Sequence, residues 1–230
     1  MSANRLSDYM AASEQARRTI LRSCKFRPRA RVIQHSEAKE SIAAFLSSEI
    51  DAETLETRAE IMRSGLRATD FENEVAENNA DYIDRFREQQ LQLPGGAQEV
   101  KKAGRMTSLD LDGFTLSFSP DLLLKRVNRR NVPKIGVAFF RYSRNKPLAD
   151  EVACWQGAIS MGYLTTKLHQ GTGDVDMDSE RALCVAFDVW TGRTHEAPSN
   201  AVYRFKEVRA VCAGIAERWD QIQPPPGAVF

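Results

Sequence analysis

Apolar positions recur at helical spacing through the first 90 residues of the chain. This period predicts four amphipathic helices, over residues 7–21, 36–46, 51–67 and 70–91. Pro28 ends the first helix, because proline disfavours a helical conformation in the residue before it. The segment 93–97, Leu-Pro-Gly-Gly-Ala, stops helix formation and marks a boundary. We therefore expect a helical N-terminal region over residues 1–92.

Beyond this boundary the period changes to the polar–apolar alternation of strands. Alternating segments flank Asp112-Gly113, and this dipeptide favours the tight turn of a β-hairpin. Two nearly all-apolar runs, 134–142 and 181–190, suit strands that are buried on both faces. The remaining expected elements are strand 122–125, helix 148–169, an edge strand after Gly192 and helix 199–222. Residues 100–230 are therefore expected to form an α/β (α+β) core with a mixed sheet, on which the N-terminal helices pack.

Composition narrows the class of protein. The chain has 230 residues, of which 42% are apolar and 27% are charged, so it has material for a core and wholesale disorder is excluded. No apolar run reaches the roughly 18–20 residues of a membrane span, and the N-terminal residues lack the apolar segment of a signal peptide. Four widely spaced cysteines argue against a disulfide scaffold or a zinc module. The expectation is a cytoplasmic protein without a membrane partner.

Charges are segregated along the chain, although the net charge is only +1. Residues 1–32 carry a net charge of +6, residues 37–90 carry −8, and residues 101–146 carry +8. Two interpretations stay open: the basic segments form a surface that binds phosphates, or the acidic helices lie against them and neutralise them. The first interpretation predicts nucleic acid as a partner, and the second predicts a protein-interaction or assembly module. The sequence leaves the oligomeric state open.

The expected element order, and three segments within it, carry a family resemblance. A helix, a three-strand meander, a helix and a fourth strand form the αβββαβ core of the restriction-endonuclease-like PD-(D/E)XK nucleases. Residues 113–124, GFTLSFSPDLLL, resemble the second strand of that family, where an aspartate binds the catalytic metal, and Asp121 occupies this position. Residues 135–146, IGVAFFRYSRNK, resemble the third strand, which carries an acidic residue, any residue and lysine. The helix with Gln156 and Tyr163 resembles the RecB-like branch, in which a glutamine and a tyrosine share one helix face.

The resemblance implies Mg²⁺-dependent phosphodiester hydrolysis in an active member. Two carboxylates would hold the ion, and the lysine would orient or deprotonate the attacking water. This sequence departs from the pattern, because Phe139 occupies the acidic position and Arg141 the lysine position. Phenylalanine cannot bind a metal, and arginine cannot act as a general base because it stays protonated. Three acidic residues are candidates for a displaced second ligand beside Asp121: Glu74, Glu77 and Asp188.

We expect a nuclease-like protein with a degenerate catalytic site that binds nucleic acid, with DNA as the candidate partner, through a basic strand and loop face. The candidate catalytic residues, or their remnants, are Asp121, Arg141, Gln156 and Tyr163. The candidate metal ligands are Asp121 and Glu77, and no cofactor is expected except Mg²⁺ in an active form. The candidate nucleic-acid contacts beside this site are Lys125, Arg126, Arg129, Arg130, Lys134, Arg144 and Lys146. Two alternatives remain: a protein–protein assembly module without nucleic-acid binding, and an active metal-dependent nuclease with a displaced acidic ligand.

Overall fold

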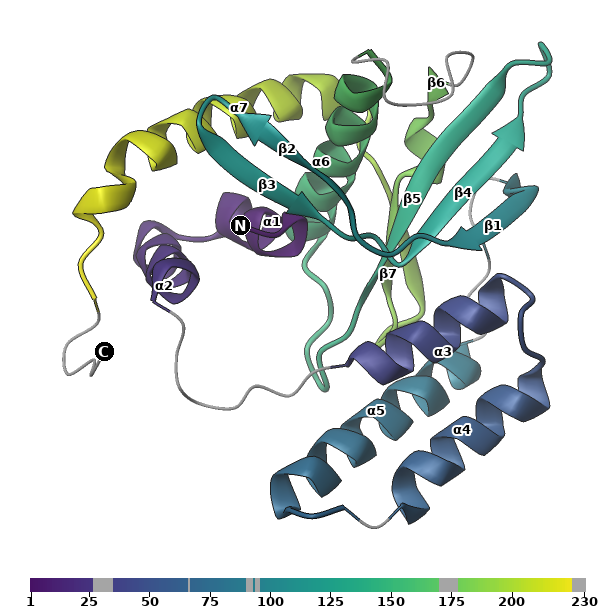
Figure 1. Cartoon of the computed structure of the whole chain (residues 1–230). Coiled ribbons are helices and arrows are strands. Elements are labelled where there is room, and N and C mark those ends of the chain that lie inside the picture. The colour runs from purple at the N-terminus through teal and green to yellow at the C-terminus, as the bar shows by residue number, and fades with distance from the viewer. Residues whose placement is uncertain (27–34, 66, 90–92, 94–95, 170–177, 225–230) are drawn as a thin grey trace.

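The computed structural model describes residues 1–26, 35–65, 67–89, 93, 96–169 and 178–224. A mixed sheet lies at its centre, with helices on both faces (Figure 1). Five strands follow one another across this sheet: β1 (Glu99–Lys102), β4 (Leu122–Val127), β5 (Pro133–Arg141), β7 (Val185–Asp188) and β8 (Arg193–Glu196). The short β6 (Asp178–Ser179) pairs with the beginning of β5. The expected α+β class with a mixed sheet is therefore confirmed.

Strand directions follow from the connections. The strands β1, β4 and β5 pair antiparallel, whereas β7 pairs parallel to β5 after the chain has crossed over through α6 (Asp150–His169). A parallel pair needs such a crossover, because its second strand starts at the same end as the first. The strand β8 closes the edge antiparallel to β7. The central position of β5 explains its nearly continuous apolar sequence, since residues 135–140 are all buried.

One face of the sheet is covered by three helices and a hairpin. The helices are α1 (Ala3–Ala11), α6 and α7 (Ala201–Arg218), and the hairpin consists of β2 (Met106–Leu111) and β3 (Phe114–Phe118). Buried side chains of all these elements form one apolar core with Val137 and Phe139 of β5. The helix α2 (Glu14–Lys25) lies outside this core and has no fully buried residue. Two 3₁₀ turns, η2 (Arg181–Leu183) and η3 (Trp219–Gln221), complete this part of the chain.

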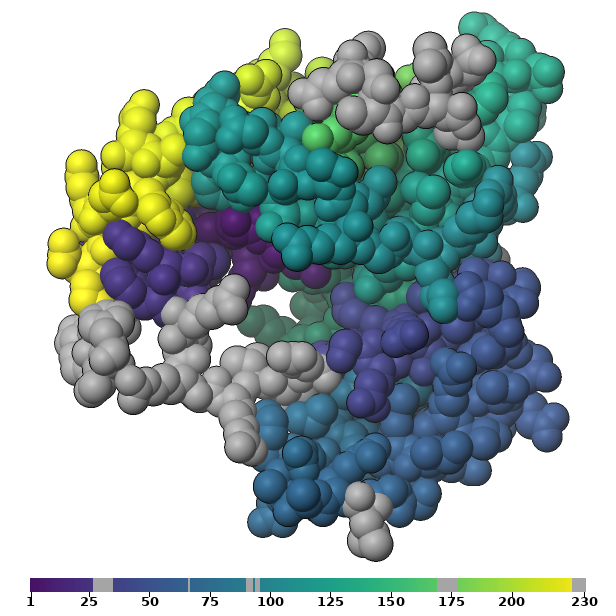
Figure 2. Space-filling view, in the orientation of Figure 1, coloured from purple at the N-terminus to yellow at the C-terminus, as the bar shows by residue number. Residues whose placement is uncertain are grey.

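The opposite face is covered by α3 (Ser36–Leu46), α4 (Ala52–Ser64) and α5 (Asp70–Gln89). These helices form the lower layer of the molecule, while α2 and α7 form its left flank (Figure 2). Their apolar side chains form a second core with Ala138 and Phe140 of β5. Successive residues of β5 therefore enter different cores, as the alternation of side chains along a strand requires. Among the described helices, none has the length and apolar composition needed to cross a membrane.

Several sequence predictions hold, and two need correction. The helices expected over 36–46, 51–67 and 70–91 are α3, α4 and α5. The single helix expected over 7–21 is wrong: the chain is extended at Ala12, and Ser13 begins α2 by accepting a hydrogen bond from the amide of Ala16 at 3.4 Å. As a result, residues 1–92 are divided between the two faces of the sheet, with α1 and α2 on one side and α3–α5 on the other (Figure 1).

The second correction concerns the meander. The hairpin β2–β3 forms a sheet of its own, so residues 113–124 contain two strands that belong to different sheets. The first strand of the observed meander is β1, which the alternation of the sequence does not predict. Its sequence, Glu-Val-Lys-Lys, has a single apolar residue, because an edge strand is held by pairing with its neighbour and not by burial on both faces.

Candidate functional site

Polar side chains from both sides of the sheet gather where β5 ends. The parallel strands β5 and β7 both end here, and the carboxyl ends of parallel strands are where open α/β sheets commonly bind ligands. We call this group the strand-end cluster, and it consists of Ser7, Asp8, Lys39, Tyr82, Asp121, Arg141 and Gln156. Three of its members, Asp121, Arg141 and Gln156, are candidate site residues from the sequence.

Asp121 lies in the turn between β3 and β4, and its carboxylate binds a backbone amide and a lysine from two other segments of the chain. Its Oδ2 accepts a hydrogen bond from the backbone amide of Phe140 at 2.6 Å and forms an ion pair with Lys39 Nζ at 3.2 Å. Burial raises the pKa of the Asp121 carboxyl, and the opposing effects of Lys39 and the Phe140 amide offset this only in part. The carboxylate therefore already has a fixed cation and a fixed donor.

Arg141 is the last residue of β5, and its side chain reaches α1 and α6. The guanidinium forms an ion pair with Asp8 and donates a hydrogen bond to Gln156 Oε1 at 3.2 Å. Ser7 Oγ donates to the same oxygen at 2.9 Å, and both Ser7 and Gln156 are completely buried. Arg141 thus connects the sheet to two helices.

Four buried polar atoms around this cluster have no hydrogen-bond partner among the described residues: Asn4 Oδ1, His35 Nδ1, Tyr82 Oη and Gln156 Nε2. A buried donor or acceptor without a partner costs about 1–3 kcal/mol. Burial raises the pKa of Tyr82 well above its ordinary value, and the charge of Asp121 acts in the same direction. The cluster therefore retains unused hydrogen-bonding capacity inside the molecule.

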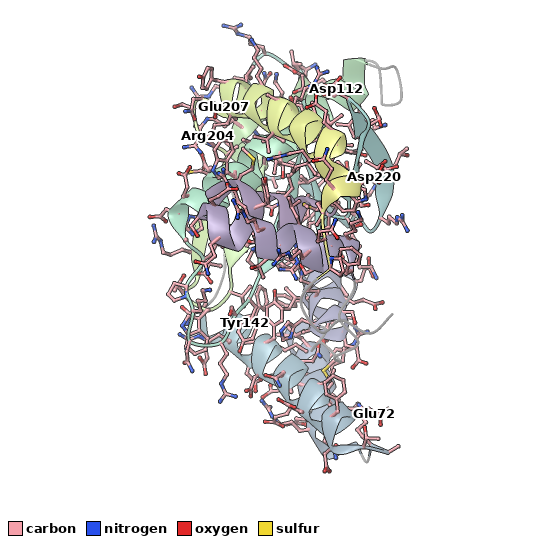
Figure 3. All side chains as sticks on the ribbon, turned by 90° about the vertical axis from the view of Figure 1, so that its left-hand side faces the viewer. Glu72, Asp112, Tyr142, Arg204, Glu207 and Asp220 are labelled. Atoms are coloured by element: carbon pink, nitrogen blue, oxygen red, sulfur yellow. The ribbon has the colours of Figure 1, made fainter. Side chains whose placement is uncertain are left out.

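Aromatic rings cover Tyr82, one member of this cluster. The ring of Tyr142, the residue after β5, stacks on Tyr82 of α5 with the ring centres 4.4 Å apart (Figure 3). His35 contacts both rings edge-on at 5.4 Å. Trp190 lies 6.3 Å from Tyr142, and the guanidinium of Arg85 lies 4.6 Å from a Trp190 ring centre. This layer explains why Tyr82 is fully buried although its hydroxyl has no partner in the described structure.

A cavity of about 410 Å³ opens beside the cluster, next to the beginning of α6. Its lining includes Asp8, Arg141, Lys146 and Asp188. Asp188 accepts hydrogen bonds from the amide of Leu148 at 3.0 Å and from Thr191 Oγ1 at 2.6 Å, so its carboxylate holds two loops together. Asp188 is a candidate for the displaced metal ligand, but its carboxylate is already used in these hydrogen bonds.

The other candidate residues of the catalytic site lie elsewhere. Tyr163 donates a hydrogen bond to the carbonyl of Thr107 at 2.6 Å, and its ring stacks on Phe118 inside the apolar core. Glu77 forms an ion pair with Arg63 at 3.4 Å on the outer side of α5, so the structure does not bring Glu77 to Asp121. Glu74 is exposed on the same helix. Among the described residues, no group of three or more histidines, cysteines and carboxylates is arranged to hold a metal ion.

The seven candidate nucleic-acid contacts are divided between two ends of the sheet. Arg144 and Lys146 follow β5 beside the strand-end cluster, whereas residues 125–134 surround the turn between β4 and β5 at the opposite end. Asp121 and Arg126 are five residue steps apart, which is about 17 Å along an extended strand. The expectation that all seven adjoin one site is therefore wrong, because β4 and β5 run antiparallel over their full length.

Ion pairs distinguish the members of this group. Arg126 pairs with Glu180, Lys134 pairs with Asp178 at 2.6 Å, and Arg144 pairs with Asp81 at 3.4 Å. Arg129 and Arg130 are exposed at the tip of the β4–β5 turn, and the backbone hydrogen bonds of this turn fix the positions of their Cα atoms. Lys146 is exposed as well, beside the strand-end cluster, so Arg129 and Arg130 are the members of the group that present two exposed cations side by side.

The tip of this turn borders a cavity of about 590 Å³, which we call the hairpin groove. Its lining residues are Gly96, Gln98, Arg126, Val127, Asn128, Arg129 and Arg130, with no carboxylate among them. Asn128 Oδ1 accepts hydrogen bonds from the amides of Arg130 and Val132 at 2.9 and 3.0 Å. The left-handed backbone of Asn131, with φ of 60°, completes the turn. The local sequence thus holds the turn that carries the arginines in a defined conformation.

Four residues of the strand-end cluster were missed by sequence reasoning: Ser7, Asp8, Lys39 and Tyr82. For Lys39 a signal exists, since it precedes Ile42 by three residues and Leu46 by seven and so occupies the apolar face of its helix.

A scan against protein-family models finds no match, and a search of curated proteins finds no similar sequence. The functional inference therefore rests on the geometry of these sites.

Proposed function

We propose that this chain is a nuclease-like protein of PD-(D/E)XK architecture, in which internal ion pairs replace the metal site, and that it binds nucleic acid through the hairpin groove. The architecture is supported by the order of α5, the meander β1–β4–β5, α6 and β7, which is the helix, three strands, helix and strand of that family's core. It is also supported by Asp121, which directly precedes the middle strand of the meander.

Binding rather than catalysis is favoured by the state of the strand-end cluster. Magnesium sites use carboxylate oxygens and water in octahedral geometry. Here Asp121 binds Lys39, Arg141 binds Asp8, and Phe139 is buried in the apolar core. Each charge that the family would direct at metal and phosphate is therefore matched by an opposite charge of the same chain.

The hairpin groove carries the nucleic-acid part of the proposal. Three arginines and no carboxylate line it, and Arg126 is paired with Glu180, so Arg129 and Arg130 supply the charge for a ligand. Arginine presents a planar fork of donors that matches the oxygens of a phosphate. Exposed Val127, 44% accessible, adds an apolar contact beside the charges. A surface of this kind contacts the phosphate backbone and gives salt-dependent affinity without direct sequence readout.

Binding of labelled single- and double-stranded DNA, at 50 and 200 mM salt and with or without Mg²⁺, tests the proposal. We expect binding that weakens with salt and an affinity loss of about tenfold in Arg129→Ala/Arg130→Ala, with a salt slope reduced by about 2. The matched control is Arg67→Ala/Lys206→Ala, which removes two exposed cations elsewhere. Absence of binding at low salt, or equal losses in both variants, would overturn the binding site. Cleavage of the DNA in the Mg²⁺ samples would contradict the proposal that the catalytic site is lost.

A protein-interaction module without nucleic-acid binding is the second candidate. It is favoured by two ion pairs that join the acidic segment, residues 37–90, to the basic segment, residues 101–146: Lys102–Glu49 and Arg144–Asp81. These contacts neutralise part of the segregated charge within the chain. If no DNA binds in any sample, this candidate replaces the first.

A further inference from the structure

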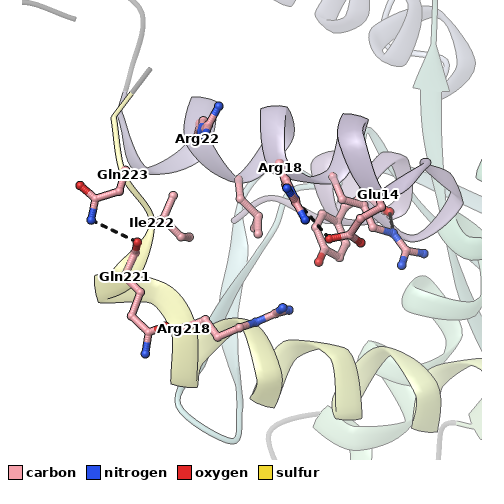
Figure 4. A pocket seen from close by; sticks show the side chains of 10 residues that line it. Glu14, Arg18, Arg22, Arg218, Gln221, Ile222 and Gln223 are labelled. Carbon is pink, nitrogen blue, oxygen red and sulfur yellow. Dashed lines mark hydrogen bonds and ion pairs between the residues drawn. The ribbon is translucent and has the colours of Figure 1, made fainter. Parts of the chain in front are cut away.

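A second cationic cavity lies between α2 and the carboxyl end of α7, and we call it the arginine cleft (Figure 4). Its volume is about 310 Å³, and it shares no lining residue with the hairpin groove or with the cavity beside the strand-end cluster. Its charged lining residues are Glu14, Arg17, Arg18, Arg22 and Arg218. Four cations and one carboxylate give this lining a net charge of +3.

Polar contacts at both ends of α2 add to the packing of Ile20 and Leu21 against the core in fixing its position. The guanidinium of Arg17 donates to the carbonyls of Tyr9 and Met10 at 3.1 and 2.9 Å, where α1 ends. At the other end of α2, Lys25 Nζ donates to the carbonyls of Trp219, Asp220 and Ile222 beyond α7. Since no residue of α2 is fully buried, these contacts contribute to holding the helix beside α7, with the cleft between them.

The positive charges of the cleft are only partly neutralised by carboxylates. Arg18 pairs with Glu14 at 3.5 Å, but both side chains are about two-thirds or more exposed, and such pairs are weak. Arg22 follows Arg18 by four residues on the same helix, an arrangement in which like charges repel. Figure 4 shows Arg18 and Arg218 projecting into the space between the two helices. A dianion bound there relieves this repulsion and satisfies the free guanidinium donors.

We propose that the arginine cleft binds a phosphate ester of nucleotide size. The phosphate would lie between Arg18 and Arg218, because paired guanidinium groups bind phosphate oxygens in a planar fork. Tyr9, Leu21 and Ile222 supply the apolar lining on which the organic part of the ligand packs. The volume matches the lower end of the range for small-molecule sites. A free mononucleotide and the terminal phosphate of a nucleic acid present this same chemistry.

Calorimetric titration distinguishes these two sources. The probes are adenosine monophosphate and one oligonucleotide, prepared with a 5′-phosphate or a 5′-hydroxyl end. The Arg129→Ala/Arg130→Ala protein serves as the host, so that binding at the hairpin groove is weakened. What remains of that binding is the same for the 5′-phosphate and 5′-hydroxyl ends, so the difference between the two ends is independent of the function proposed above. A preference for the mononucleotide, or for the 5′-phosphate end over the 5′-hydroxyl end, identifies the source and supports the proposal.

Variants of the cleft give effects of opposite sign. In the same host, Arg18→Ala/Arg218→Ala is expected to weaken binding by about tenfold or more, since it removes two charge-assisted donors to the phosphate. Glu14→Gln is expected to tighten binding about two- to fivefold, because it removes the competing carboxylate. The control, Arg209→Ala, removes an exposed cation of α7 outside the cleft and is expected to have no effect. Equal binding by all variants, or no binding of any probe, would overturn the proposal.

Discussion

At one end of the β4–β5 pair, Asp121 and Arg141 are bound to Lys39 and Asp8, while at the other end Arg129 and Arg130 reach into solvent. Both ends carry charged side chains on the same two strands. At the first end, α1, α3 and α6 close over the strands, so that a charge there needs a partner from within the chain. The comparison shows that the elements covering a strand end, and not the residue types alone, decide whether its charges stabilise the fold or remain available for a ligand.

The largest effect is expected from removing the cation beside Asp121. Lys39→Ala leaves a buried carboxylate without its ion-pair partner, and breaking such a pair costs about 3–5 kcal/mol. Urea unfolding measures this loss. The double variant Lys39→Ala/Asp121→Asn is the control, and it is expected to recover part of the stability because no buried charge remains.

The same variant has a defined pH dependence. Burial already raises the Asp121 pKa above its ordinary value of 3.8, so its contribution to stability is greatest below pH 3.8 and is lost as the pH rises through the folded pKa. Without Lys39 the folded pKa rises further. The destabilisation by Lys39→Ala is therefore expected to be larger at pH 8 than at pH 5, and an equal loss at both values would show that Asp121 does not carry it.

A smaller loss is expected at Arg141. Arg141→Ala removes the ion pair to Asp8 and the hydrogen bond to Gln156, at a cost of about 2–3 kcal/mol. DNA affinity is expected to stay within about twofold of wild type, because the hairpin groove lies at the other end of β5. A fall in affinity as large as that of Arg129→Ala/Arg130→Ala would contradict the separation of the two ends.

Tyr82→Phe tests the unused hydrogen-bonding capacity of the cluster. The Tyr82 hydroxyl is buried and has no partner in the described structure, so its removal is expected to leave the free energy of unfolding unchanged or to raise it by up to about 1 kcal/mol. Thermal and urea unfolding measure the change. A loss above 1 kcal/mol would mean that the hydroxyl makes a stabilising interaction, and Tyr142→Phe, which changes a half-buried ring of the same stack, is the comparison.

The smallest effect on stability is expected at the hairpin. Arg129→Ala/Arg130→Ala is expected to change the free energy of unfolding by no more than about 0.5 kcal/mol, because both side chains are exposed. Urea unfolding of this variant beside Arg141→Ala gives the sharpest contrast between the ends. A loss above 1 kcal/mol at the hairpin would remove the distinction between them.

The sequence predicts most helices and strands of the fold, because each of them buries the apolar residues whose spacing indicates it. The run 134–142 is nearly all apolar since β5 lies between two cores, and the Asp112-Gly113 turn joins β2 and β3 as expected. The strand β1 is missed because its formation depends on pairing with β4. The separate sheet of the β2–β3 hairpin is missed for a related reason, since local alternation does not tell which strands pair.

The candidate site could be predicted only in part. Asp121, Arg141 and Gln156 all lie near the end of β5, because Asp121 directly precedes the strand paired with β5, Arg141 ends β5, and Gln156 is on the helix that follows. Their partners Asp8 and Lys39 come from helices on opposite sides of the sheet, more than 80 residues away in sequence. Short-range patterns do not contain that information. The ion-pair partner of each charged residue therefore depends on how distant helices pack.

The association of α1 with α6 has a consequence for synthesis in the cell. The first helix carries Leu6, Tyr9 and Met10, which are buried in the core with residues of a helix that begins at Asp150. At a synthesis rate of about 5–20 residues per second, the nascent chain exposes this apolar surface for about 7–30 s before its partner exists. The ribosome-bound chain is thus expected to expose the apolar face of α1 until α6, whose residues cover it, has been translated.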